Sequence, residues 1–170
     1  MLQKPPMRSF EVFAAMTPEQ AEAFFRRIKE QAPAYFAQNL HAASAALKTR
    51  PAYLLKQAFP KQVSAVRRAL SRVASNPAAD EALAIYFLEV RKELLVEWLD
   101  TAGVAHDEGA LQEDSPGQPA EDLLRKSVAS FRNATEDDDR ELLLRAFAAQ
   151  DSIDWPCLDE LLTERLATNS

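Results

Sequence analysis

Most prolines of this chain stand at the beginning of amphipathic runs, and this placement restricts the possible folds more than any other feature. Seven prolines each precede a run whose apolar residues have helical spacing: Pro18, Pro33, Pro51, Pro60, Pro77, Pro119 and Pro156. Proline suits the first turn of a helix, because its φ is fixed and that position needs no N–H donor. All glycines lie between Gly103 and Gly117, and no strand-like alternation of useful length occurs. The sequence therefore predicts an all-α fold, a compact bundle of about seven to eight helices.

Four of these helices are predicted before residue 76, over 18–32, 33–49, 51–59 and 60–75. Thr17 and Gln20 have the spacing of a capping box at the start of the first one. The fourth has the clearest amphipathic pattern, because its basic residues lie opposite its apolar face. The residues of that apolar face are Val63, Val66, Leu70 and Val73.

A long helix is predicted over 77–102, and its length makes it the central helix of the bundle. Asn76 is its expected N-cap, and Gly103 is its expected stop. Apolar side chains cover more than half of its circumference, which is typical of a helix that others surround.

The predicted organisation is an N-terminal helical bundle over 1–104, an exposed connection over 105–118 and C-terminal helices over 119–170. The connection is rich in glycine, acids and proline. Three shorter helices are expected after it, and we expect them to pack on the same core. The chain is then a single domain of ordinary size.

The charges of this chain are segregated along the sequence. Residues 31–79 contain seven Lys and Arg and no Asp or Glu. From Asp80 to the end, 22 acids stand against 8 bases. Two fields of opposite sign result, and these steer a partner or hold two parts of one molecule together.

The basic residues of the 48–72 segment are the best candidates for a partner-binding surface. They are Lys48, Arg50, Lys56, Lys61, Arg67, Arg68 and Arg72. Such a cluster binds an acidic protein partner or, with Tyr53 and Phe59 as stacking faces, the phosphates of a nucleic acid. The same pattern is also typical of the solvated face of an amphipathic helix, or of a complement to the acidic half. An overall acidic chain, with a pI near 5.0, is unlike a nucleic-acid module.

Arg91 is the candidate ligand-binding residue, because it projects from the apolar side of the predicted long helix. A guanidinium in that position needs a carboxylate or carbonyl partner. We therefore expect Arg91 to be mostly buried and paired, either as a core ion pair or as an anion-binding residue in a pocket. Four carboxylates on the opposite side of the helix are interpreted as an exposed polar edge: Glu89, Glu93, Glu97 and Asp100.

Three further features are interpreted as structural. The run His106 to Glu108 lies in a predicted turn, where polar residues collect. The acids 136–139 follow Thr135, the expected N-cap, and favour the positive end of a helix dipole. Cys157 has no plausible base near it in sequence and is expected to be a packing residue.

The single cysteine excludes an internal disulfide and favours a reducing compartment. No apolar run of about 18 residues is present. We therefore expect a cytoplasmic protein without membrane attachment.

We expect a non-catalytic helical interaction or scaffold protein that uses residues 48–72 and its acidic C-terminal half to bind a protein partner or a second copy. Nucleic-acid binding through the basic residues is one alternative. A pocket for a small anion or substrate around Arg91, Tyr86 and Glu93 is another. No nucleophile elbow, P-loop, dinucleotide fingerprint or zinc-protease motif occurs, which favours a non-catalytic protein with no cofactor and no metal.

Overall fold

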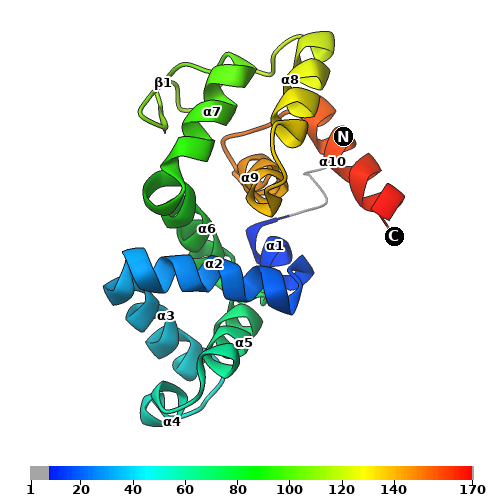
Figure 1. Cartoon of the computed structure of the whole chain (residues 1–170). Helices are drawn as coiled ribbons and strands as arrows, with labels where there is room; N and C mark the ends of the chain where they lie inside the picture. Colours follow the sequence, from blue (N-terminus) through cyan, green and yellow to red (C-terminus); the bar gives the residue numbers. More distant parts are fainter. Residues whose placement is uncertain (1–7, 170) are drawn as a thin grey trace. The chain divides into compact units, whose positions relative to one another are not determined.

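The fold is all-α, as the sequence predicts, in a computed structural model that describes residues 8–169 (Figure 1). This part of the chain contains ten α-helices and one two-stranded antiparallel hairpin. Of the helices in the described range, none combines the length and the apolar character that crossing a membrane requires.

Contacts divide the chain into two units, and the boundary falls between Tyr86 and Phe87. The N-unit is Ser9–Tyr86, and the C-unit contains Arg8 and the chain from Phe87 onward. The predicted boundary was the connection 105–118, which instead lies inside the C-unit. The charge segregation follows the two units: the N-unit has ten Lys and Arg against six Asp and Glu, whereas residues 87–170 have eight against twenty.

The N-unit contains six α-helices around a core rich in aromatic side chains. Its elements are α1 (Ser9–Ala15), α2 (Pro18–Gln31), α3 (Pro33–Ala46), α4 (Pro51–Leu55), α5 (Phe59–Leu70), a 3₁₀ turn (Val73–Ser75) and α6 (Asn76–Ile85). The predicted capping box is present at α2, where Thr17 and Gln20 bond each other's backbone N–H. Phe24 stacks on Tyr86 at 4.1 Å between ring centroids, and both are fully buried. The chain leaves the α5 helix after Leu70, so Val73 is 66% exposed and does not join the predicted apolar face.

The C-unit packs α7 against α8 and α9, and α10 against α8 and α9. Its elements are α7 (Lys92–Ala102), β1 (His106–Asp107), β2 (Ala110–Leu111), α8 (Glu121–Asn133), α9 (Asp138–Ala149) and α10 (Pro156–Asn169). Trp98 lies at the centre of the core, beside Phe131 and Phe147. Trp155 packs on Phe147 and donates its indole N–H to the carbonyl of Pro116.

The predicted long helix over 77–102 is interrupted. After α6 the chain makes one π-helical turn, Tyr86–Val90, and Arg91 then leaves the helical region with φ −120° and ψ 46° before α7 begins. The apolar residues predicted to cover one long helix therefore belong to two helices. Each of these helices contributes to the core of a different unit. Leu83 of α6 is buried in the N-unit, and Leu94, Trp98 and Leu99 of α7 are buried in the C-unit.

The connection 105–118 is mostly exposed, and it contains the β1–β2 hairpin that the sequence did not predict. Glu108 and Gly109 form its two-residue loop, and both have positive φ, 50° and 95°. This is the turn geometry that matches the twist of a hairpin. His106 stabilises the loop: its Nδ1 accepts the Gly109 N–H at 3.0 Å, and its Nε2 lies 2.7 Å from Asp100 Oδ1.

Gly109→Ala should destabilise the C-unit more than Gly103→Ala. A Cβ at Gly109 would lie 3.1 Å from Leu95 Cδ2, in addition to the strain of its φ. Gly103 also has a positive φ, 72°, but no side chain of a more distant described residue lies within 4 Å of such a Cβ. We expect a loss in free energy of unfolding of about 2 kcal/mol for Gly109→Ala and about 1 kcal/mol for Gly103→Ala. Urea unfolding followed by tryptophan fluorescence measures both, and equal losses would contradict the close contact with Leu95.

Candidate partner-binding surface

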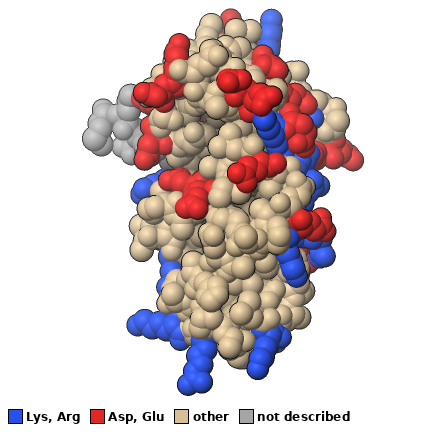
Figure 2. All heavy atoms as spheres, turned by 90° about the vertical axis from the view of Figure 1, so that its left-hand side faces the viewer, with Lys and Arg blue, Asp and Glu red and all other residues tan. Residues whose placement is uncertain are grey.

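The seven predicted partner-binding cations all lie in the N-unit, from the end of α3 to just beyond α5. Five of them are exposed and form neither an ion pair nor a side-chain hydrogen bond with any residue in the described part of the chain: Lys48, Arg50, Lys56, Lys61 and Arg68. We call these five residues the basic surface. Figure 2 shows Lys and Arg without Asp or Glu at the end of the N-unit that α3, α4 and α5 build; within the C-unit, acids gather on the surface in view.

The other two predicted cations, Arg67 and Arg72, have a structural role. Arg67 is half-buried and donates to the carbonyls of Phe13 and Ala14, both at 3.2 Å, in the last turn of α1. Arg72 donates to the carbonyl of Ala46, the last residue of α3, at 2.5 Å. Both donate to carbonyls in the last turn of a helix, where no N–H of the same helix is available as a partner. The structure therefore separates them from the basic surface.

Two apolar side chains of α4 are exposed beside these cations. Tyr53 is 62% exposed and Leu55 is 51% exposed, whereas Leu54 between them is buried. The helix is held by Gln62, whose Nε2 lies 3.3 Å from the carbonyl oxygens of both Leu54 and Leu55. The basic surface thus has apolar side chains on a fixed helix among its charges.

Two cations that the sequence analysis missed lie next to the first turn of α5. Arg26 and Lys29 of α2 stand over the Phe59 ring, at 5.0 and 5.1 Å from its centroid. Their spacing of three residues places them on one face of α2. That spacing was the available signal, but only the packing of α2 on α5 brings them to the Phe59 ring at the start of α5.

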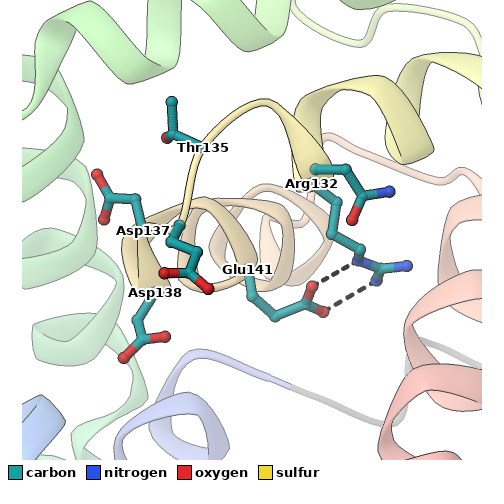
Figure 3. A pocket seen from close by; sticks show the side chains of 7 residues that line it. Arg132, Thr135, Asp137, Asp138 and Glu141 are labelled. Atoms are coloured by element: carbon teal, nitrogen blue, oxygen red, sulfur yellow. Dashed lines mark hydrogen bonds and ion pairs between the residues drawn. The ribbon is translucent and has the colours of Figure 1, made fainter.

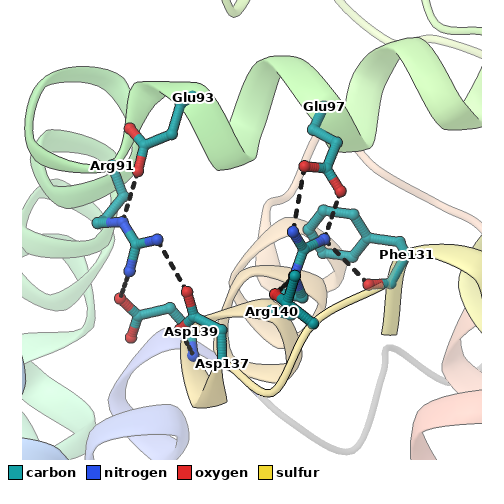
Figure 4. Close-up of polar contacts among 8 residues, drawn as sticks. Arg91, Glu93, Glu97, Phe131, Asp137, Asp139 and Arg140 are labelled. Carbon is teal, nitrogen blue, oxygen red and sulfur yellow. Dashed lines mark hydrogen bonds and ion pairs between the residues drawn. The ribbon is translucent and has the colours of Figure 1, made fainter. Parts of the chain in front are cut away.

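Arg91 is buried and paired, as predicted (Figure 4). Its Nε, Nη1 and Nη2 donate to Glu93 at 2.7 Å, Asp139 at 2.7 Å and Asp137 at 2.8 Å. Burial alone would lower the pKa of Arg91, but the hydrogen bonds to Asp137 and Glu93 raise it above its ordinary value. Asp137 is also the N-cap of α9, through its contact with the Asp139 N–H, in place of the predicted cap Thr135.

This arrangement makes Arg91 an internal ion-pair centre. Each nitrogen of its guanidinium already donates to a carboxylate, and the negative charges of these three carboxylates would repel an anionic ligand. The ligand-binding interpretation of Arg91 therefore has no support in this geometry. The network instead joins the start of α7 to the start of α9 within the C-unit.

Arg140 forms a second buried centre, which the sequence analysis missed. It is 5% exposed, pairs through two nitrogens with Glu97, and donates to Thr135 Oγ1 at 2.9 Å and the Phe131 carbonyl at 3.1 Å (Figure 4). Its guanidinium also lies 4.8 Å from the centroid of the Phe131 ring. Arg140 precedes Leu143, Leu144 and Phe147 by three, four and seven residues, and this helical spacing was the signal for a buried position.

The predicted polar edge of α7 is only partly free. Glu93 and Glu97 pair with the two buried arginines, and Asp100 contacts His106. Glu89 is exposed. Three of these four carboxylates therefore already pair with basic side chains of the C-unit.

A surface hollow of about 610 Å³ lies beside the start of α9. It is lined by Arg132, Asn133, Thr135, Glu136, Asp137, Asp138 and Glu141. Arg132 donates from Nε and Nη2 to the two carboxylate oxygens of Glu141, at 2.6 and 3.0 Å (Figure 3). Within the described residues, no three His, Cys, Asp or Glu side chains are arranged to hold a metal ion.

Cys157 should react slowly with thiol reagents in the folded protein. It is buried, and burial raises the pKa of its thiol; Arg125 opposes this effect, and Glu121, Glu160 and Glu164 add to it. Since the thiolate is the reactive form, we expect reaction with a disulfide reagent at neutral pH to be at least about tenfold slower than in urea. Arg125→Gln should slow it further. Equal rates in the folded and unfolded chains would contradict this account.

Comparison with protein-family models, curated proteins and solved structures finds no match for this chain. The function proposed for it therefore depends on its own residues. Arg91 and Arg140 are internal ion-pair centres, whereas the basic surface combines exposed unpaired cations with exposed apolar side chains. The basic surface is accordingly the candidate functional site.

Proposed function

We propose that this chain is a non-catalytic interaction protein that binds an acidic protein partner through the basic surface of its N-unit. The observation that carries the proposal is the group of five exposed, unpaired cations in a segment without a single acid. Like charges held together on one surface repel each other, and an acidic partner removes that repulsion. Complementary potentials also raise the association rate and select the partner.

A second copy of this chain belongs to the same class of partner. Its C-unit carries twenty acids against eight bases over residues 87–170. Association of this kind joins different surfaces of the two copies. It should weaken as salt is added, because exposed charges are screened over about 8 Å at physiological ionic strength.

Nucleic acid is the second candidate partner, and the exposed ring of Tyr53 is the observation that favours it. The acidic C-unit acts against this function, since a long polyanion is repelled by the same molecule that would bind it. We therefore place an acidic protein first.

A charge-reversal variant of the full chain tests the proposal. Lys56→Glu, Lys61→Glu and Arg68→Glu together should weaken binding of a fluorescein-labelled oligoglutamate peptide by at least about tenfold, a loss of about 1.4 kcal/mol. Fluorescence anisotropy at low salt measures the affinity, and a single-stranded oligonucleotide of equal charge is the competing probe.

The matched control reverses three cations of the C-unit, Lys92, Arg125 and Lys126, and so changes the net charge by the same amount. If the control weakens binding as much as the test variant, the effect belongs to net charge, and the basic surface is not the site. Tighter binding of the oligonucleotide than of the peptide would replace the proposed partner class with nucleic acid. Circular dichroism verifies that both variants remain folded.

A further inference from the structure

Tyr53 is placed between two cations on one face of α4. Arg50 precedes it by three residues and Lys56 follows it by three, and this spacing puts side chains of a helical turn on the same side. Arg50 and Lys56 are the N-cap and C-cap residues of α4. The 62% exposed Tyr53 ring is thus flanked by an exposed positive charge in each direction along the helix.

The backbone that carries Tyr53 is held from several sides, although α4 is only five residues long. Gln62 binds the carbonyls of Leu54 and Leu55, and Gln57 Nε2 lies 3.4 Å from the carbonyl oxygen of Tyr53. Leu54 is 4% exposed and anchors the helix to the N-unit. A side chain presented from an already ordered backbone loses less entropy when a partner binds.

We infer that the partner is a short acidic protein segment with apolar side chains among its acids, and that Tyr53 is the anchor that those side chains cover. This inference rests on the proposed function. An apolar centre with a charged rim is the usual arrangement of a protein interface, and tyrosine is among the residues that contribute most to affinity. The partner's acids face Arg50 and Lys56, and an apolar side chain between them covers the Tyr53 ring.

The second exposed apolar side chain of α4 favours a protein segment over a nucleic acid. Leu55 is 51% exposed and lies on the flank of α4 opposite Tyr53, on the other side of the buried Leu54. A base stacks on an aromatic ring, but an aliphatic side chain offers no such face. An apolar side chain of a peptide packs on either residue.

The charge of the whole molecule favours a short segment. The chain has a net charge of −6, and all of its excess acid lies in the C-unit. A bilayer or a long polyanion carries more negative charge than the five cations of the basic surface neutralise, and the remaining charge meets a molecule that is acidic overall. A short segment meets only the cations around α4, because charges farther away than about one Debye length are screened.

The test compares two labelled peptides of equal length and charge on the full chain. One alternates glutamate with serine, and the other has leucine in place of some of the serines. We expect the leucine peptide to bind at least about tenfold more tightly, and the difference to persist at high salt because burial of apolar surface is not screened. Tyr53→Ser should remove most of that difference, because the leucine side chains then lose the ring that they cover.

The matched control is Val73→Ser, which removes an apolar side chain that is 66% exposed elsewhere in the N-unit. It should change neither affinity. Equal binding of the two peptides to the unaltered chain, or a Tyr53→Ser variant that keeps the difference, overturns the inference but leaves the proposed function in place. Failure of both peptides to bind overturns the proposed function itself. An oligonucleotide that binds more tightly than either peptide and requires Tyr53 overturns both.

Discussion

Arg91→Met should lower the free energy of unfolding of the C-unit by about 3 kcal/mol. The substitution keeps the volume of the buried stem but removes the cation that three carboxylates contact. Asp137 and Asp139 are then left close together, mostly buried and without that charge. Their side chains are 26% and 16% exposed, so water offsets part of the loss, and we expect the low end of the range for a broken buried pair.

Urea unfolding followed by tryptophan fluorescence reports the unfolding of the C-unit, because Trp98 and Trp155 both lie there. Lys92→Met is the matched control: Lys92 is the next residue, and its ion pair with Glu108 is exposed, so we expect less than about 1 kcal/mol. Arg91→Lys should lie between the two, since an ammonium group reaches fewer of the three carboxylates. A loss for Arg91→Met no larger than that for Lys92→Met would show that the network contributes no stability.

Trp98→Ala should have the largest effect of any substitution considered, a loss of about 4 kcal/mol in the free energy of unfolding. Trp98 is fully buried, with ring centroids 5.5 Å from Phe131 and 5.8 Å from Phe147. Its removal leaves a cavity between α7, α8 and α9 that rigid aromatic neighbours fill poorly. The remaining Trp155 reports the unfolding, and far-UV circular dichroism shows whether the N-unit helices persist.

Trp98→Phe and Trp155→Phe separate packing from hydrogen bonding at these two positions. Among the described residues no acceptor bonds Trp98 Nε1, so phenylalanine there removes a buried N–H that has no partner. Trp155 Nε1 donates to the Pro116 carbonyl at 2.9 Å, and phenylalanine there leaves that carbonyl without its donor. We expect the Trp155 variant to lose about 1–2 kcal/mol more than the Trp98 variant. The opposite order would indicate that the Trp98 N–H has a partner, such as an ordered water.

The places where prediction failed in this chain share a cause. Both parts of 77–102, before and after Arg91, have helical periodicity and are helical. The periodicity does not tell, however, whether the two apolar stripes lie on one continuous helix or on two helices in different cores. Arg91 was expected to be buried because its neighbours are apolar. Its partners Asp137 and Asp139 could not be predicted, because they lie more than forty residues away in the chain. Only the packing of α7 on α9 brings them to Arg91.

The candidate site, too, was only partly predictable from the sequence. The cation-rich segment 48–72 is evident from composition, but Arg67 and Arg72 are no different in sequence from Arg68. Because the last turns of α1 and α3 lie close to them, Arg67 and Arg72 donate to carbonyls there. Arg68 is exposed and makes no such contact within the described residues. The importance of Tyr53 likewise depends on Leu54, which points inward and leaves the flanking side chains in solvent.

Local physics explains what could be derived from the sequence of this protein by itself. Proline at first turns, the Thr17–Gln20 capping box and apolar spacing act between residues a few positions apart, so they determine the all-α class and most helix starts without any tertiary contact. Only the tertiary structure decided three other features. These are the partners of the buried charges, the division of the chain after Tyr86, and which cations remain free of internal contacts. Each of these depends on contacts between distant helices, whose free energy is gained only when both surfaces are in place.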